Sequence, residues 1–401
     1  MTAHYTVISA DTHAGGSHAQ YRDYLERKYL DDFDAWRGRY RNPFKDLGDD
    51  RRLRNWDNEM RSTAQLADGV VGEVIFPNTV PPFFPSFVLS APPPKPEDYE
   101  HRLAGVRAHN RWLVDFCAVF PQQRAGIGQI FVNNLDDALA DARWIADHGL
   151  RGGLLLPNIP PDAVWIEHHL YDPYWEPLWS FCAEAGVIVT SHGGTGVPDF
   201  GKVPSAPLLY IGEFQFYQQR PFLHLLLSGV FERHPDLKFV MTEMGAAWLP
   251  PLLTRLDMSI IRIREKGAIG ELRYAEDSVL PLTATEYFRR NCWVGVSQPK
   301  LPDVQAVVEL GLDRFMWGSD YPHDEGTAPY TREHLRQLFH AWSEDDLRPF
   351  LGGTAARVYA YDLDALEPLA VAWGPTVDEI KVPLTELPPH PNEALVRGLV
   401  G

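Results

Sequence analysis

Val7-Ile8-Ser9-Ala10-Asp11-Thr12-His13 is the stretch that decides the fold. An apolar run, expected as a strand over residues 5–10, is followed by a carboxylate and an imidazole two residues apart. Side chains at i and i+2 of an extended chain point to one face, so Asp11 and His13 can reach the same small cation. A barrel of parallel strands gathers its strand ends at one rim. Three later strand-like runs also end in a residue able to bind a metal or move a proton, namely His192, Glu243 and Asp320.

Short apolar runs alternate with helical patterns along most of the chain. Runs of this length with little polar alternation are typical of a parallel sheet buried on both faces. Strand–helix–strand units with right-handed crossovers, repeated to eight strands, predict a (β/α)8 barrel of the TIM type. The alternative, an open doubly wound sheet, would be expected to carry a Gly-rich phosphate turn after its first strand, and the sequence has none there. The expected strands are 5–10, 71–76, 124–130, 150–156, 187–191, 237–242, 291–296 and 314–319. The clearest helical patterns are 134–149, 173–185, 221–232 and 302–310.

Two insertions and a tail lie outside the minimal barrel. The first insertion, 14–70, is charged and aromatic, and we expect helices over the catalytic face. The second, 77–121, opens with a Pro- and Phe-rich loop in which Phe83 and Phe84 either line a substrate cavity or pack against the first insertion. The barrel with its insertions is therefore expected over 1–361. The Pro-rich extension 362–401 is expected to be a wrapping arm or a subunit contact.

Composition excludes several classes of partner. The chain has 401 residues, of which 45% are hydrophobic and 23% charged, as in ordinary globular proteins. Its formal charge of −17 repels phosphates, so neither nucleic acid nor an anionic membrane is an expected partner. No apolar stretch approaches the roughly 20 residues that span a bilayer, and the first residues show no secretion signal. We expect a cytoplasmic protein that acts on a small molecule, with a homo-oligomer left open.

The strand-end residues together predict a metal site. A catalytic divalent metal needs three or four nitrogen or oxygen ligands and one open position. Asp11, His13, His192 and Asp320 supply two imidazoles and two carboxylates at predicted strand ends. Taken singly, such an aspartate is often a helix cap and such a histidine a hydrogen-bonded structural residue. Taken together they predict one divalent ion. Zinc suits these ligands best, and iron(II) or manganese also fits.

Four motifs carry a family resemblance: Ile8-Ser9-Ala10-Asp11-Thr12-His13, Ser191-His192-Gly193-Gly194, Gly229 through Lys238, and Trp317-Gly318-Ser319-Asp320-Tyr321-Pro322-His323. Through them, most of residues 5–360 resembles the amidohydrolase superfamily. The similar branch is the amidohydrolase-related one that includes aminocarboxymuconate-semialdehyde decarboxylase and the resorcylate-type decarboxylases. The resemblance implies that Asp11, His13 and His192 are metal ligands. It also implies that Asp320 is the eighth-strand aspartate that binds the metal and takes a proton from its water.

The chain departs from that superfamily at two positions. Many of its hydrolases place a carbamylated lysine after strand four to bridge two metals, whereas this strand ends Leu154-Leu155-Leu156-Pro157-Asn158, which favours a single metal. The decarboxylases carry a histidine of a His-Gly-Gly run after strand six, where this chain has Glu243. Decarboxylation by the familiar route is thereby disfavoured.

Several residues have more than one open role. Glu243 either orients a water, adds a fifth ligand or caps the helix beginning near residue 247. His323 either stabilises an oxyanion, protonates a leaving group or supports a ligand. Arg220 either pairs with an anionic substrate group or lies solvated at a helix start, and His224 is either a core histidine or a substrate contact.

These observations favour metal-assisted hydrolysis of an acyl bond, in which a bound water with a pKa near 7 attacks an amide, ester or thioester. Asp320 accepts and returns the proton, and the Pro- and Phe-rich loop implies a bulky apolar substrate. The first alternative is non-oxidative decarboxylation of an aromatic or unsaturated acid. The second is a barrel that binds small molecules without turnover.

Overall fold

The computed structural model describes residues 3–41, 50–87, 89, 91–275 and 279–398. Within the predicted insertions, residues 42–49, 88 and 90 lie outside this described part. Residues 1–2 and 276–278 of the predicted barrel and residues 399–401 of the predicted extension also lie outside the described part.

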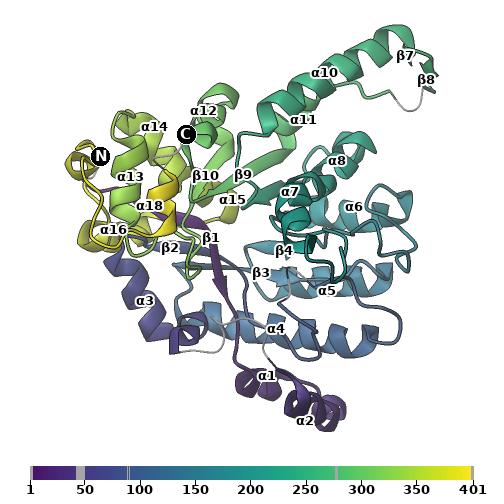
Figure 1. Cartoon of the computed structure of the whole chain (residues 1–401), viewed down its shortest axis with the longest axis horizontal. Helices are drawn as coiled ribbons and strands as arrows, with labels where there is room; N and C mark the ends of the chain where they lie inside the picture. Colours follow the sequence, from purple (N-terminus) through teal and green to yellow (C-terminus); the bar gives the residue numbers. More distant parts are fainter. Residues whose placement is uncertain (1–2, 42–49, 88, 90, 276–278, 399–401) are drawn as a thin grey trace.

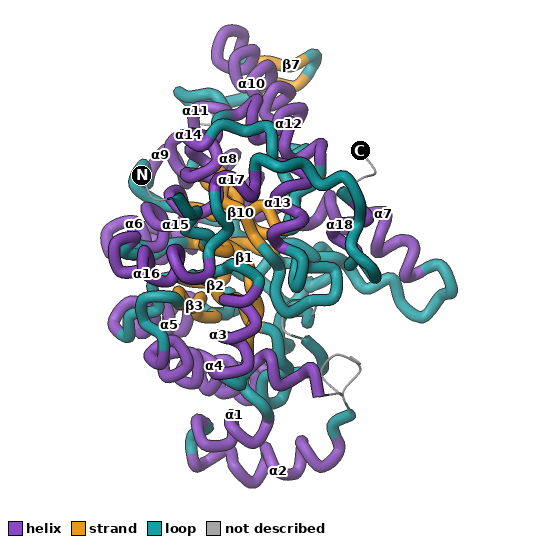
Figure 2. The backbone as a smooth tube through the Cα atoms, turned by 90° about the vertical axis from the view of Figure 1, so that its left-hand side faces the viewer, coloured by secondary structure: helices purple, strands orange, loops and turns teal. Residues whose placement is uncertain are grey.

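Eight parallel strands form one sheet in the order β1-β2-β3-β4-β5-β6-β9-β10, and helices surround it (Figures 1 and 2). The predicted (β/α)8 barrel is confirmed. Each expected run overlaps one strand, with shifted ends. The strands are β1 (Ile8–Ala14), β2 (Gly72–Pro77), β3 (Arg124–Gln129), β4 (Gly153–Leu155), β5 (Val189–His192), β6 (Phe239–Thr242), β9 (Cys292–Ser297) and β10 (Phe315–Gly318).

Alternate side chains along each strand enter two different apolar cores. Ile8, Val74 and Ile127 point into the barrel, together with the corresponding residues of other strands. Val7 and Ile75, one position away, join the larger core between sheet and helices. Both faces of the strands are therefore buried, which explains why the runs show so little polar alternation.

The barrel closes between β1 and the segment that follows β10. The backbone N–H of His13 donates to the carbonyl of Tyr321 at 2.6 Å, and that of Asp320 donates to the carbonyl of Asp11 at 2.9 Å. One layer below, the N–H of Ser319 donates to Ser9 Oγ at 2.8 Å. These contacts place the carboxyl ends of the first and last strands side by side.

The helices follow the strands as the sequence predicts, with one exception. Asn134 caps α5 through its side chain, and Gly186 ends α6 in the left-handed conformation. The expected helix 221–232 is two helices, because Gly229 adopts a φ of 77° between α8 and α9. The helices between barrel strands are α4 (Tyr99–Val119), α5 (Leu135–Asp147), α6 (Glu176–Ala185), α7 (Ala206–Gln218), α8 (Arg220–Leu227), α9 (Val230–Arg233), α10 (Leu249–Lys266), α11 (Ala284–Asn291) and α12 (Leu301–Leu310). After β10 come α13 (Thr331–Phe339), α14 (Glu344–Arg348) and α15 (Thr354–Tyr359).

Additional elements extend this frame. In the first insertion, α1 (His18–Tyr24) and α2 (Leu30–Arg39) lie beside α4, and α3 (Asn58–Ala67) precedes β2 (Figure 1). A two-stranded hairpin, β7 (Ala268–Ile269) and β8 (Leu272–Arg273), lies at the tip of the projecting α10. Among the described residues, no helix is both long enough and apolar enough to cross a membrane.

The tail contains helices that its weak periodicity did not predict: α16 (Leu363–Trp373), α17 (Val377–Ile380) and α18 (Glu393–Arg397). It wraps onto the N-terminal segment, where Tyr5 N–H donates to the carbonyl of Pro375 at 2.9 Å and Val377 N–H donates to that of Ala3 at 2.9 Å. Arg332 of α13 pairs with Glu379 of α17 at 2.8 Å. The segment is thus a wrapping arm within this chain.

A buried ion cluster supports the strand that carries Asp11 and His13. Glu73 of β2 accepts from Arg61 at 2.5 Å and from Arg124 at 3.1 Å, and all three side chains are almost completely buried. Arg61 also donates to the carbonyl of His13 at 2.8 Å, and Thr12 donates to Glu73 at 2.9 Å. Burial opposes the charge on Glu73, but the two guanidinium groups lower its pKa to about 2.

We predict that Glu73→Gln lowers the free energy of unfolding at pH 7 by about 3–5 kcal/mol, because two buried arginines lose their counter-charge. The native carboxylate has the lower pKa, so the unfolded state binds more protons between pH 4.5 and about 2. The stabilisation is complete above pH 4.5 and is lost as the pH falls through that window. Urea unfolding should show the difference between wild type and variant shrinking below pH 4.5.

Asp34→Asn is the matched control, since its pair with Arg22 is half exposed and should contribute little. An equal effect of both substitutions, or a pH-independent difference for Glu73→Gln, would contradict the assignment.

Candidate metal centre

Five metal-capable side chains gather at the carboxyl ends of the strands. Asp11 and His13 belong to β1 and His192 ends β5, while Glu243 follows β6 and Asp320 follows β10. The Nε2 atom of His13 lies 3.4 Å from Asp11 Oδ1, and that of His192 lies 3.6 Å from the same oxygen. Glu243 Oε2 is 3.1 Å from His192 Nε2. Asp11, His13, His192 and Glu243 therefore each offer one atom to a common point.

Asp320 lies beside this group and shares His13 with it. Its Oδ1 atom is 3.3 Å from His13 Nε2 and 2.8 Å from His323 Nδ1. His323 stacks on the His13 ring at a centroid separation of 4.1 Å, and its Nε2 lies 3.1 Å from Asn78 Oδ1. The structure thus brings all predicted metal and acid–base residues together. It places Glu243, rather than Asp320, in the four-residue group.

The hydrogen bonding of these side chains fits a metal ion. Asp11 Oδ1, His13 Nε2, His192 Nε2 and Asp320 Oδ1 are buried, and apart from the 2.8 Å contact between Asp320 and His323 none of them has a hydrogen-bond partner among the described residues. Burying unpaired polar atoms is costly, and those of Asp11, His13 and His192 lie close enough together to suit a shared cation. Three carboxylates and two imidazoles match the ligand preferences of a divalent transition metal.

The other polar atom of each of these four side chains is held by a neighbour. Ser297 donates to Asp11 Oδ2, and Gln298 donates to Asp320 Oδ2 at 2.9 Å. His13 Nδ1 lies 3.3 Å from the carbonyl of Pro77, and His192 Nδ1 lies 3.0 Å from that of Gly193. Such contacts fix the orientation of metal ligands and the tautomer of ligating histidines.

The backbone is strained where two of the carboxylates are attached. Glu243 has a φ of 57° and Asp320 a φ of 61°, a region that residues other than glycine rarely adopt. Gly193, next to His192, has no room for a side chain, since a Cβ there would lie 2.1 Å from the carbonyl oxygen of Glu243. Such strain persists where the surroundings hold it, commonly at functional sites.

Mutual electrostatics dominate the ionisation of this centre. Burial, then the charges of Asp320 and Asp11, raises the pKa of Glu243 well above its usual value. Burial alone would lower the pKa of His13, but Asp11 and Asp320 raise it to about 10. So much negative charge in a buried place is the environment that a divalent cation neutralises.

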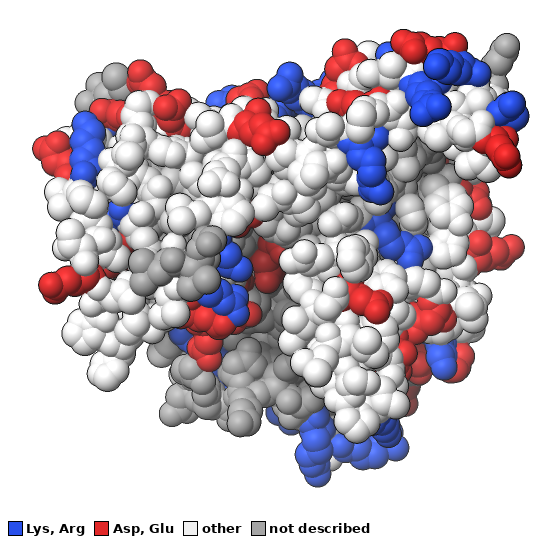
Figure 3. Space-filling view, turned by 45° about the horizontal axis from the view of Figure 1, so that its top comes forward, with Lys and Arg blue, Asp and Glu red and all other residues white. Residues whose placement is uncertain are grey.

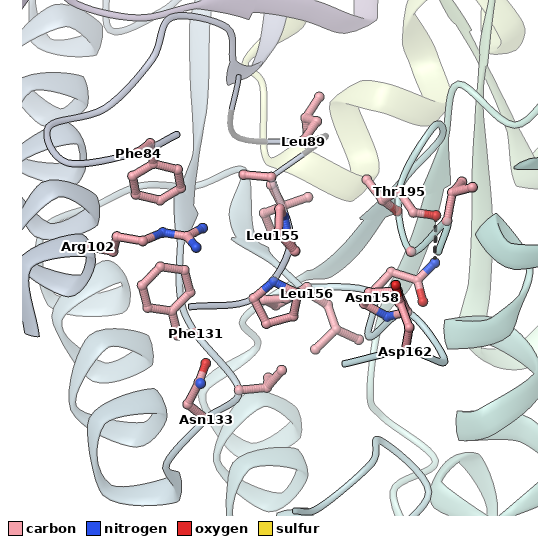
Figure 4. Close-up of a pocket in the computed structure, with 18 of the residues that line it drawn as sticks. Phe84, Leu89, Arg102, Phe131, Asn133, Leu155, Leu156, Asn158, Asp162 and Thr195 are labelled. Atoms are coloured by element: carbon pink, nitrogen blue, oxygen red, sulfur yellow. Dashed lines mark hydrogen bonds between the residues drawn. The ribbon is translucent and has the colours of Figure 1, made fainter. Parts of the chain in front are cut away.

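A cavity of about 620 Å³ opens on the same face as these residues, a size typical of sites for small molecules. The loops that follow β2, β3, β4 and β5 form its walls, and Figure 4 shows part of the lining. The lining includes Gly194, two residues beyond His192, and the carbonyl of Gly194 accepts from Tyr210 at 3.0 Å. Burial, followed by the charge of Glu243, raises the pKa of Tyr210.

The structure separates the four predicted substrate residues. Phe84 lines the cavity, whereas Phe83 packs against the first insertion, with its ring 6.1 Å from Phe33 and 5.8 Å from Trp36. Arg220 and His224 of α8 are not part of the lining. His224 faces Tyr171 at a ring separation of 5.0 Å instead. Burial, followed by the charge of Arg220, lowers the pKa of His224 to about 4, as in a core histidine.

Sequence reasoning missed several residues of this face. Gln129 and Gln298 both stand at strand ends, so applying the strand-end rule to amides would have found them. Ser297 ends β9 in the same way. Arg102 lies inside α4, which carries several other arginines, and no local pattern marks it as part of the cavity.

Acidic and basic side chains are interspersed around the edges of the face seen in Figure 3, with uncharged stretches between them. Although the whole chain has a net charge of −17, this face does not carry one continuous acidic patch.

The fold and its strand-end ligand cluster define a metal-dependent (β/α)8 barrel. The family model described as amidohydrolase matches residues 67–360, well over half of the chain. The protein belongs to this amidohydrolase family, as its motifs suggested.

Three relatives illustrate the likeness. Gamma-resorcylate decarboxylase of a Rhizobium species is 24% identical over 260 residues, which cover 63% of this chain and 74% of the relative. The structure of an amidohydrolase from Mycobacterium avium subsp. paratuberculosis superimposes with a TM-score of 0.62 at 19% identity, covering 88% of this chain and 99% of that one. The structure of 5-carboxyvanillate decarboxylase from Novosphingobium aromaticivorans, with manganese and a substituted nitrobenzoic acid bound, gives a TM-score of 0.62 at 20% identity, covering 89% and 98%.

The prediction of an acyl-bond hydrolase is wrong. The relatives that match in sequence are gamma-resorcylate decarboxylases, which supports the first alternative, decarboxylation of an aromatic acid. The prediction relied on Glu243 as a sign of water activation. In the structure, Glu243 lies within the ligand group, 3.1 Å from His192, where a carboxylate is compatible with either chemistry.

Losing a residue that hydrogen-bonds to a metal ligand typically lowers metal affinity about 10–100-fold. We predict that Asp11→Asn and His192→Gln each lower the metal affinity by more than this, because each substitution removes a ligand itself. Elemental analysis after dialysis measures the bound metal. His224→Gln is the matched histidine control and should retain the wild-type metal content. Full metal content in both ligand variants, or its loss in His224→Gln, would contradict the assigned centre.

Proposed function

We propose that this protein is a metal-dependent decarboxylase that removes carbon dioxide, without oxidation, from an aromatic or unsaturated carboxylic acid. The observation that carries the proposal is the likeness to gamma-resorcylate decarboxylase over 260 residues. A metal-capable centre beside an enclosed cavity supports it.

In this proposal Asp11, His13, His192 and Glu243 would hold one divalent ion. A divalent ion there supplies positive charge that binds the substrate carboxylate and stabilises negative charge on its oxygens. Zinc is the ion favoured by the sequence. Manganese is supported by the three carboxylates and by the manganese bound in the 5-carboxyvanillate decarboxylase structure.

The cavity accounts for the binding of an apolar ring. Phe84, Phe131 and Leu155 form apolar walls, and all three are buried (Figure 4). Such walls exclude water, so charges that develop on a bound substrate interact strongly with the protein.

Asp320 is the residue assigned to proton transfer. The reaction adds one proton to the ring carbon and breaks the bond from that carbon to the carboxyl group, so a carboxylate plus a proton gives the ring C–H product and carbon dioxide. His323 lies 2.8 Å from Asp320 Oδ1 and can pass a proton to it, while Gln298 fixes Oδ2. A positioned acid of this kind contributes about 10²–10⁴-fold to a rate.

We predict that Asp320→Asn lowers the rate of carbon dioxide release about 100-fold or more, because the amide cannot deliver the proton. Circular dichroism should show an unchanged fold. The wild-type reaction in heavy water should place one deuterium on the carbon that carried the carboxyl group, detected by mass spectrometry.

Asp147→Asn, on the outer surface of α5, is the matched control and should keep full activity. Full turnover in Asp320→Asn would remove its proton-transfer role. A metal-loaded wild type that releases no carbon dioxide from a panel of aromatic acids would refute the proposed function.

A further inference from the structure

One end of the cavity holds a buried cation. The side chain of Arg102, on α4, lies between the rings of Phe84 and Phe131, with its guanidinium carbon 4.4 and 5.6 Å from their centroids. The residue is only 4% exposed. Figure 4 shows the guanidinium group directed past the two rings into the cavity.

The guanidinium of Arg102 forms no ion pair with a carboxylate of the described residues, and its Nε atom has no hydrogen-bond partner among them. The charge of Asp98 favours the protonated form of Arg102 without forming such a pair. The two other deeply buried arginines, Arg61 and Arg124, both pair with Glu73. Burial lowers the pKa of Arg102 to about 10, which leaves it charged at neutral pH. A buried charge normally has a counter-charge, so a missing one points to a ligand.

Other polar atoms of the same cavity are also unsatisfied and include further donors. Gln129 Nε2 and Trp165 Nε1 are buried N–H groups without a hydrogen-bond partner among the described residues. The two carboxylates of the lining, Asp162 and Asp199, are exposed residues. A buried cation and unpaired N–H donors beside apolar wall residues are complementary to an anionic group on an apolar body.

We propose that Arg102 binds a second carboxylate of the substrate, away from the one that reacts at the metal centre. The substrates are then aromatic or unsaturated dicarboxylic acids. The planar guanidinium fork, fixed between two aromatic rings, matches a carboxylate through two parallel hydrogen bonds. This substrate class rests on the proposed decarboxylation, whereas the anion subsite rests on the cavity alone.

Calorimetric titration of the metal-loaded protein tests the subsite without turnover. The probes are benzoate and benzene-1,3-dicarboxylate. Wild type should bind the dicarboxylate on the order of 10-fold more tightly or better, as expected for a charge-assisted bond. Arg102→Met keeps the length and the packing between the rings, and should abolish this preference while leaving benzoate affinity within about twofold. Arg102→Lys should retain part of the preference, because the charge remains.

Arg107→Met is the matched control on the same helix, since Arg107 is paired with Asp137 and Asp141. It should leave the preference unchanged.

An equal preference in Arg102→Met and wild type, or none in wild type, would overturn the proposal. If Arg102→Met does not fold, a reduced preference in Arg102→Lys supports the proposal and an unchanged preference contradicts it. A preserved preference without carbon dioxide release would refute the proposed function alone. Carbon dioxide release from monocarboxylates with no dicarboxylate preference would refute the subsite alone.

Discussion

Closure of the barrel between its first and last strands is the constraint on which the centre depends. The backbone hydrogen bonds from His13 to Tyr321 and from Asp320 to Asp11 join segments more than 300 residues apart in the sequence. They hold the carboxylates of Asp11 and Asp320 beside the His13 imidazole, 3.4 and 3.3 Å from its Nε2 atom. Gly318 permits this approach, because a Cβ there would lie 2.9 Å from the Cβ of Asp11. The same contacts therefore complete the sheet and assemble the ligands.

The ligands are supported by polar groups placed behind them. Arg61 of the first insertion connects Glu73 on β2 to the carbonyl of His13, so the insertion contributes to the ligand strand and not only to the surface. Ser297 and Gln298, at the end of β9, orient Asp11 and Asp320 in turn. A rigid centre of this kind can impose one geometry on a metal and its substrate, which catalysis by positioning requires. The cavity adds apolar walls, and the charged side chain of Arg102 lies between two of the aromatic rings that form them.

The sequence predicted the barrel and the cluster because both follow from local rules. Buried strands leave apolar runs, and residues at the ends of parallel strands meet at one rim, so Asp11, His192 and Asp320 were found without any long-range information. The cavity depends instead on loop conformation and helix packing. Contacts with the first insertion decide which of Phe83 and Phe84 faces the cavity, because the ring of Phe83 packs against Phe33. The backbone at Phe83 also adopts a positive φ of 68°. The reaction was mispredicted because one carboxylate, Glu243, was made to decide between two chemistries that share a ligand set.

The central claim is that side chains of β1 and β5, far apart in the sequence, coordinate one metal ion. X-ray absorption spectroscopy of the metal-loaded protein measures this directly. The account predicts a first shell with two imidazole nitrogens and at least one carboxylate oxygen at about 2.0–2.2 Å. A shell with sulfur ligands, or one made only of water oxygens, would contradict it.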